Sequence, residues 1–290
     1  MKYAYYPGCS AESTARDQYI SVGQVARALG IDLVELKGWT CCGSTPAHQT
    51  SKILAIALPA ANLLMAQKQD LDMVVFCASC YNRMKIANHE IQNNAGIRHE
   101  VAKYLGEDYD GKVKVRHFVE VLVSDIGIQK LQKQFTHTLD GLKVASYYGC
   151  LLVRPTDATG FDDPENPTLL DRLVKSMGGE SIDWPQKVAC CGGGFAISRT
   201  DIVVELSNSI LNMAKSSGAQ CITVACPMCQ INLDMRQVDI SKMKKTTYEM
   251  PVVYITQLLG LCLGISWRKL AMNKCIVSPK PVTDAVKVLV

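Results

Sequence analysis

The chain has 290 residues, of which 48% are hydrophobic, 20% are charged and 13 are cysteines, and its formal net charge is +4 at pH 7. This length is sufficient for two domains that each bury a core. The small, scattered charge argues against nucleic-acid binding, and no run of about 18 apolar residues predicts a membrane-spanning helix. The first residues lack the pattern of a signal peptide. We therefore expect a cytoplasmic protein whose thiols stay reduced.

Strand and helix patterns alternate along the first half. Strands are predicted at residues 3–6, 32–36 and 73–76, and helices at 22–29 and 53–63. Helical runs at 118–123 and 128–135 follow in a linking segment. The second half repeats the pattern with a strand at 144–148, a loop at 155–167, a helix at 203–213 and a strand at 222–225. This order is typical of parallel α/β units, so we expect two tandem domains, residues 1–140 and 141–290, related by a pseudo-twofold axis.

Ten of the cysteines form two copies of one pattern: a single Cys, then Cys-Cys-Gly, then Cys-x-x-Cys. The first copy leaves gaps of 31, 34 and 2 residues between its cysteine groups, and the second leaves gaps of 39, 34 and 2. The ten residues are Cys9, Cys41, Cys42, Cys77 and Cys80, and Cys150, Cys190, Cys191, Cys226 and Cys229. Each group follows a predicted strand. Because ligands bind at the carboxyl edge of open parallel sheets, the five thiols of one copy can converge there.

Three kinds of site compete for these cysteines. A zinc site uses Cys-x-x-Cys pairs but needs four ligands, not five. A thiol–disulfide exchange site uses one Cys-x-x-Cys at a helix N-terminus and leaves the other cysteines unexplained. Iron–sulfur ligation explains all ten, and we favour it. The remaining Cys221, Cys262 and Cys275 have no counterparts in the repeat, and we expect them to be buried apolar residues.

The doubled motif resembles the duplicated CCG cysteine-rich domain in the B subunit of heterodisulfide reductase, over nearly the whole chain. The resemblance implies two non-cubane [4Fe-4S] clusters, each held by the five cysteines of one copy, so that the ten cysteines are both the metal ligands and the cofactor site. It also implies two partners, a small ferredoxin-like C subunit that supplies electrons and a flavin-containing A subunit. The expected chain is then the catalytic component, an oxidoreductase that cleaves or forms a disulfide in a small molecule or a protein.

The mechanism expected from the resemblance uses both copies together. Cleaving a disulfide needs two electrons, whereas iron–sulfur centres deliver them singly. Two facing clusters could each give one electron and hold one substrate sulfur. The alternative is an electron-transfer subunit of a larger dehydrogenase with no substrate of its own.

Other residues near the motifs have weaker signals. We expect Gly43 and the three glycines from Gly192 to adopt positive φ or to let the backbone approach a cofactor. His48 is a candidate proton donor. Arginines a few residues past the cysteines are candidates for attracting an anionic substrate, although a solvated surface role is the simpler interpretation: Arg83, Arg154 and Arg199.

Overall fold

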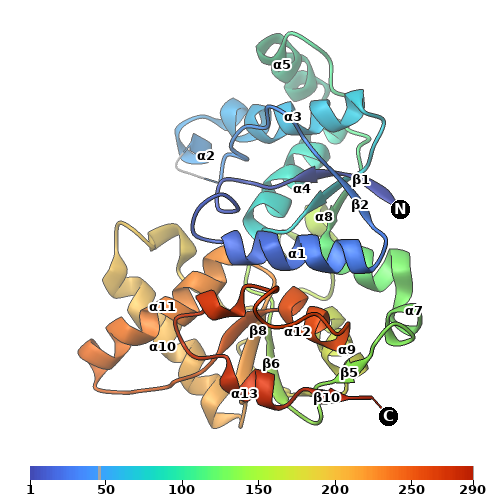
Figure 1. Ribbon diagram of the computed structural model, residues 1–290. Helices are drawn as coiled ribbons and strands as arrows, with labels where there is room; N and C mark the ends of the chain where they lie inside the picture. The colour runs from blue at the N-terminus through green and yellow to red at the C-terminus, as the bar shows by residue number, and fades with distance from the viewer. Residues whose placement is uncertain (45–46, 290) are drawn as a thin grey trace.

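The computed structural model describes residues 1–44 and 47–289, and it contains two four-stranded parallel sheets, one in each half (Figure 1). The first sheet has the order β2-β1-β3-β4 and the second the order β7-β6-β8-β9. The strands of the first are β1 (Lys2–Tyr6), β2 (Asp32–Glu35), β3 (Met73–Val75) and β4 (Val115–His117). Those of the second are β6 (Lys143–Tyr147), β7 (Glu180–Ser181), β8 (Cys221–Val224) and β9 (Val252–Tyr254). Matching order in both sheets confirms the tandem parallel α/β fold.

Helices connect the strands and cover the sheets. The first half contains α1 (Arg16–Ala28), α2 (Ala47–Thr50), α3 (Lys52–Lys68), α4 (Ala78–Asn93) and α5 (Ala95–Leu105), then α6 (Phe118–Glu120), the π-helix η1 (Val121–Gly127) and α7 (Ile128–Gln132). The second half contains α8 (Thr156–Thr159), α9 (Leu169–Ser176), α10 (Thr200–Ser216), α11 (Pro227–Lys244), α12 (Ile255–Cys262) and α13 (Lys280–Asp284). Two 3₁₀ turns complete it, η2 (Gly193–Phe195) and η3 (Met272–Lys274).

The central strands are buried on both faces. All residues of β3 and β8 are buried, as expected for parallel strands covered by helices on either side. The runs 73–76 and 222–225 were predicted as strands on the basis of this apolar character, and they are confirmed. The strands β4 and β9 were not predicted, because each runs directly into a helix and has no separate strand pattern.

Two segments differ from expectation, one in the second half and one between the two sheets. The predicted loop at residues 155–167 contains the short helix α8, which begins after Pro155 and ends at Gly160 in the left-handed conformation. Proline before a helix and glycine after it favour such a turn. In addition, β5 (His137–Thr138) pairs antiparallel with β10 (Lys287–Val288) near the end of the chain. The domain limit at residue 140 thus falls just after β5 and stays a prediction.

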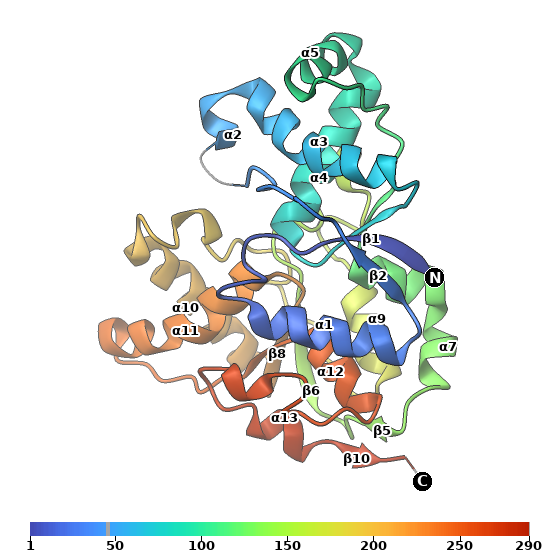
Figure 2. The same cartoon turned by 45° about the horizontal axis from the view of Figure 1, so that its top comes forward.

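The two halves pack on each other through two pairs of helices. Helix α1 of the first half lies against α12 of the second, and both views show them side by side (Figures 1 and 2). The buried hydroxyls of Ser21 and Thr256 are 2.8 Å apart at this contact. Helix α4 packs against α8, where the hydroxyl of Tyr81 donates to the carbonyl of Thr159 at 3.0 Å. These contacts hold the two sheets in a fixed relation.

Candidate functional site

Each cysteine group follows a strand of the two sheets, in the same place in both halves. The single cysteines, Cys9 and Cys150, are the third residues after β1 and β6. The first cysteine of each Cys-x-x-Cys, Cys77 or Cys226, is the residue that caps helix α4 or α11. The second, Cys80 or Cys229, lies in the first turn of that helix.

In the first half the thiols form a connected set. The Sγ atoms of Cys42 and Cys80 are 3.2 Å apart. Cys42 also contacts Cys41, and Cys80 contacts Cys77, through hydrogen bonds between their thiols. The Sγ atom of Cys41 accepts a hydrogen bond of 3.4 Å from the backbone of Gly43. The Cys-Cys pair and the Cys-x-x-Cys, 34 residues apart in the chain, therefore meet in space.

The second half repeats this arrangement. The Sγ atoms of Cys191 and Cys229 are 3.4 Å apart, and Cys229 contacts Cys226. Cys190 accepts a hydrogen bond of 3.4 Å from the backbone of Gly192 and is hydrogen-bonded to the thiol of Cys150. The contact between the Cys-Cys pair and the Cys-x-x-Cys thus recurs in both halves, whereas the contact of the single cysteine with the Cys-Cys pair is seen in the second half.

A contact between the halves joins the two sets. The thiols of Cys77 and Cys226 lie close enough for each to shift the pKa of the other, and the carbonyls directly before them both lie within 3.3 Å of the Nε2 atom of His117. Successive thiol contacts therefore lead from Cys41 through this pair to Cys191 without interruption. The two cysteine sets form one region at the junction of the halves.

Three of the thiols have lowered pKa values. Hydrogen bonds from Cys41 and Cys80 lower the pKa of Cys42 to about 3. A hydrogen bond from Cys150 lowers the pKa of Cys190 to about 6, and those from Cys229 and Cys77 hold the pKa of Cys226 well below its usual value. Thiolates are the form in which cysteine binds a metal.

One side of each set faces solvent. Cys9 and Cys190 are exposed and Cys41 and Cys150 are partly exposed, whereas the other six cysteines of the two copies are buried. A group held by either set is consequently enclosed on the side of the junction and reachable from the opposite side.

Two glycines bring the backbone close to the buried thiols. Gly8 and Gly149 precede the single cysteines, and their φ angles are +75° and +68°. A Cβ atom would lie 3.4 Å from the sulfur of Cys80 at the first position and 3.1 Å from that of Cys229 at the second. The expectation of positive φ at Gly43 and Gly192 is also confirmed, since both have φ of +78°. The two glycines that follow Gly192 do not have positive φ.

His117 connects the two sets through the backbone. Its side chain is buried, and its Nε2 atom lies 3.3 Å from the carbonyl of Phe76 and 3.2 Å from that of Ala225. These carbonyls belong to the residues directly before Cys77 and Cys226. Burial lowers the pKa of His117 to about 4, so the ring is neutral. The sequence analysis missed this residue because nothing local marks it.

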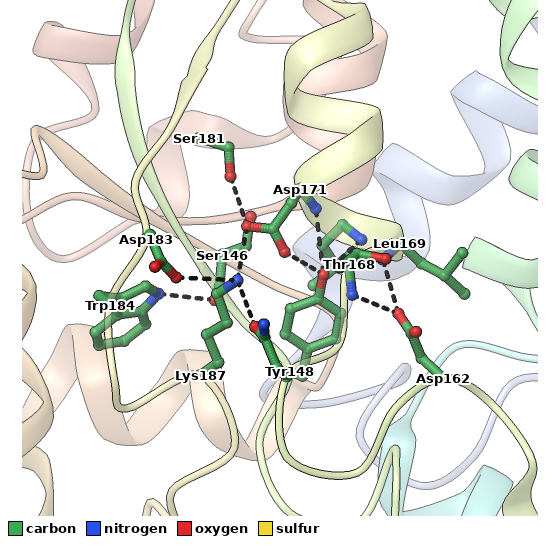
Figure 3. A network of polar contacts seen from close by, with 12 residues as sticks. Ser146, Tyr148, Asp162, Thr168, Leu169, Asp171, Ser181, Asp183, Trp184 and Lys187 are labelled. Atoms are coloured by element: carbon green, nitrogen blue, oxygen red, sulfur yellow. Dashed lines mark hydrogen bonds and ion pairs between the residues drawn. The ribbon is translucent and has the colours of Figure 1, made fainter.

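A polar network supports two cysteine loops of the second half (Figure 3). The buried ammonium of Lys187 lies 3.3 Å from the carboxylate of Asp171, and this carboxylate also accepts from the hydroxyl of Tyr148. The carbonyl of Lys187 accepts from the backbone amides of Tyr148 and Gly149, at 2.8 and 3.1 Å. The network therefore ties the segment before Cys150 to the segment before Cys190.

The donor set is suited to an iron–sulfur group. Among residues 1–44 and 47–289, no group of three or more His, Cys, Asp or Glu side chains that could hold a metal ion is found. The two sets nevertheless consist of thiols alone, the ligands of iron–sulfur clusters. The close approach of Gly8 and Gly149 to these sulfurs leaves no space for a side chain beside them. On donor chemistry, the residues fit such a group.

The candidate arginines differ in their surroundings. Arg154 pairs with Glu165 at 2.6 Å, and Arg199 pairs with Asp201 at 2.7 Å, both at the surface. Burial lowers the pKa of the half-buried Arg83, and the neighbouring Cys42 raises it. Arg83 therefore has a cysteine of the first set among the groups that shift its pKa. The side chain of His48 lies outside the described residues.

Comparison with known proteins identifies the family. The family model CCG, described as "Cysteine-rich domain", matches residues 3–85 and 144–234, once in each half. The chain belongs to the CCG cysteine-rich domain family. It is 32% identical over 252 residues to the B subunit of the "Ferredoxin/F(420)H(2)-dependent CoB-CoM heterodisulfide reductase" of Methanosarcina acetivorans, covering 85% of this chain and 84% of that protein. The resemblance to the B subunit is thereby confirmed.

Two further similarities concern a different complex and the fold. The chain is 30% identical over 279 residues to the "8-methylmenaquinol:fumarate reductase membrane anchor subunit" of Wolinella succinogenes, covering 95% of this chain and 97% of that protein. A crystal structure of a hypothetical protein from Helicobacter pylori superposes with a TM-score of 0.76 at 11% identity, over 96% of this chain and 52% of that one. In the part of the chain that the structure describes, no helix has the length and apolar character needed to cross a membrane.

Proposed function

We propose that the cysteines of the two halves, residues 1–140 and 141–290, hold two non-cubane [4Fe-4S] clusters, one in each half. The chain is then the catalytic component of a heterodisulfide reductase-like complex that cleaves or forms a disulfide. The observation that carries this proposal is the proximity of Cys77 and Cys226, whose preceding carbonyls share the Nε2 atom of His117, because it brings the two cysteine sets into one region. Separate stepping stones for electrons would not need to touch.

Both halves are needed because a disulfide takes up two electrons and two protons to become two thiols. When bound, iron–sulfur clusters supply electrons singly and offer iron as a site for sulfur. The protein holds the two sets together through the Cys77–Cys226 contact and through the hydrogen bonds of His117. The exposed Cys9 and Cys190 leave a side by which a disulfide can approach.

The proposed partners follow from the similarity to the heterodisulfide reductase protein. The name of the Methanosarcina acetivorans relative places it in a ferredoxin-dependent reductase. We infer that this chain likewise receives electrons through a ferredoxin-like C subunit and assembles with a flavin-containing A subunit in the cytoplasm. The substrate is a small disulfide or one carried by a protein.

A second candidate is favoured by the similarity to the Wolinella succinogenes protein, which covers nearly all of both chains. Here the chain would pass electrons within a larger oxidoreductase complex and have no substrate of its own. The two candidates share the clusters and differ only in whether the junction acts on a disulfide.

The first experiment measures iron and acid-labile sulfide in protein purified without oxygen. We expect about eight irons per chain, four for each set. Cys42→Ala and Cys191→Ala each lose about half of the iron, because each set is local to one half. Cys221→Ala and Cys262→Ala are matched controls, since both residues are fully buried and lie outside the repeat. Stoichiometric zinc with trace iron would disprove the cluster assignment.

The second experiment separates the two candidates. Disulfide reduction is measured with a low-potential artificial donor for the unmodified protein and for the Cys42→Ala and Cys191→Ala variants. Paired action predicts near-complete loss in both variants. Substantial turnover in either variant contradicts paired action, and no turnover in the iron-loaded unmodified protein, with any disulfide tried, favours the electron-transfer role.

A further inference from the structure

Tyr254 occupies in the second half the place that His117 occupies in the first. Tyr254 ends β9 beside Val224 of β8, as His117 ends β4 beside Val75 of β3. The backbone amide of each donates to a side-chain oxygen three residues later, at 2.9 Å for Tyr254 and 2.7 Å for His117. The two residues are therefore counterparts at the carboxyl edges of the two sheets.

The two side chains differ in what their polar atoms contact. The Nε2 atom of His117 lies within hydrogen-bond distance of two backbone carbonyls. The side chain of Tyr254 is 1% exposed, and among the described residues its hydroxyl has no hydrogen-bond partner. A buried hydroxyl without a partner destabilises a protein, so such groups in native structures call for an explanation.

The sheet places Tyr254 near the cysteines, because its strand partner Val224 precedes Cys226 by two residues. Burial raises the pKa of Tyr254 well above its usual value, and Asp17, Cys226, Cys275 and Cys77 raise it further. The hydroxyl therefore remains a protonated donor. Two of these four neighbours are the cysteines whose contact joins the sets, and Asp17 comes from helix α1 of the other half.

Resting on the proposed iron–sulfur function, we propose that the hydroxyl of Tyr254 donates a hydrogen bond to a sulfur of the iron–sulfur group at the Cys77–Cys226 contact. The acceptor is an inorganic sulfide of that group, because no cysteine sulfur among the described residues is a hydrogen-bond partner of the hydroxyl. Hydrogen bonds to these sulfurs help to set reduction potentials. A donor raises the potential because it stabilises the more negative, reduced state.

The proposal makes the two sites electronically unequal. His117 directs its Nε2 atom at backbone carbonyls, so this position supplies no equivalent hydrogen bond to a sulfur in the first half. The cluster that accepts from Tyr254 takes up an electron at a higher potential than it would without this bond. The order in which the two sites are reduced is then built into the fold.

The test uses Tyr254→Phe, which removes only the hydroxyl. Tyr109→Phe is the matched control, because Tyr109 is equally buried and its hydroxyl bonds to Asn88, away from the cysteines. The full chain is purified without oxygen, its iron is measured, and EPR-monitored redox titration gives the potentials. Electron–nuclear double resonance in H₂O and D₂O detects exchangeable protons coupled to the clusters.

We expect Tyr254→Phe to keep its iron, to lower the potential of one cluster and to lose one exchangeable proton coupling, while Tyr109→Phe matches the unmodified protein. Unchanged potentials and couplings in an iron-loaded Tyr254→Phe protein would overturn this inference and leave the proposed function standing. The same holds if Tyr109→Phe shifts a potential equally. Absence of iron from the unmodified protein would overturn the proposed function, and this inference with it.

Discussion

Replacing His117 tests whether one buried ring holds the two halves together at the cysteine sets. His117→Leu keeps an apolar side chain of similar size beside the rings of Tyr81 and Phe161. It removes the side-chain donor to the carbonyl of Ala225 and one of the two side-chain donors to the carbonyl of Phe76, which keeps the amide of Gln18. Leaving buried polar groups without a partner costs about 1–3 kcal/mol. We expect a loss of unfolding free energy of this size at pH 7.

The contribution of His117 to the unfolding free energy should also depend on pH. The pKa of His117 is lowered to about 4 in the folded protein, against about 6.5 in the unfolded chain. Between these values the unfolded state binds more protons, so stability is full above pH 6.5 and falls as the pH drops toward 4. The shift corresponds to about 3 kcal/mol at most. His117→Leu lacks this dependence, and its disadvantage at pH 7 shrinks on acidification.

The assay is urea denaturation between pH 7 and 4.5 under reducing, anaerobic conditions. His99→Leu is the control, since His99 is exposed, and it should change stability by less than about 0.5 kcal/mol. Contributions of other titrating groups cancel when variants are compared at each pH. A neutral effect of His117→Leu at pH 7, or a difference from the unmodified protein that does not vary with pH, would refute the reasoning.

Three further predictions concern other buried features. Burial raises the pKa of Asp17 to about 6, so the folded protein favours the protonated carboxyl group. Asp17→Asn should therefore raise the unfolding free energy at pH 7 by up to about 3 kcal/mol and leave it unchanged below pH 4, as measured by urea denaturation. Gly149→Ala should reduce iron content, because the added Cβ atom would press on the sulfur of Cys229. Gly141→Ala is the control: with φ of +72° and no neighbour within 4 Å, it should lower the unfolding free energy by about 1–2 kcal/mol and leave the iron content unchanged. Equal iron content in both variants would contradict this prediction. Lys187→Met should lower the unfolding free energy by about 3–5 kcal/mol, because it leaves the buried carboxylate of Asp171 without its positive partner. A loss below about 1 kcal/mol would show that this ion pair contributes little to stability.

The sequence by itself determined the duplication, the parallel α/β class and the doubled pattern of ten cysteines. These features are local: apolar runs mark buried strands, and equal spacing marks a repeated unit. Parallel strands that end at one edge bring distant cysteines together whatever lies between them. The contact of Cys42 with Cys80, and its counterpart in the second half, follow from that rule.

Only the tertiary structure decided how the two halves meet. The contact of Cys77 with Cys226 depends on the packing of α1 on α12 and of α4 on α8, which no spacing within either copy reveals. His117 and Tyr254 end strands that were not predicted from the sequence, and the role of His117 depends on a carbonyl 108 residues away. Hydrogen bonds across the junction are set by the three-dimensional packing of the whole chain, so a linear pattern does not encode them.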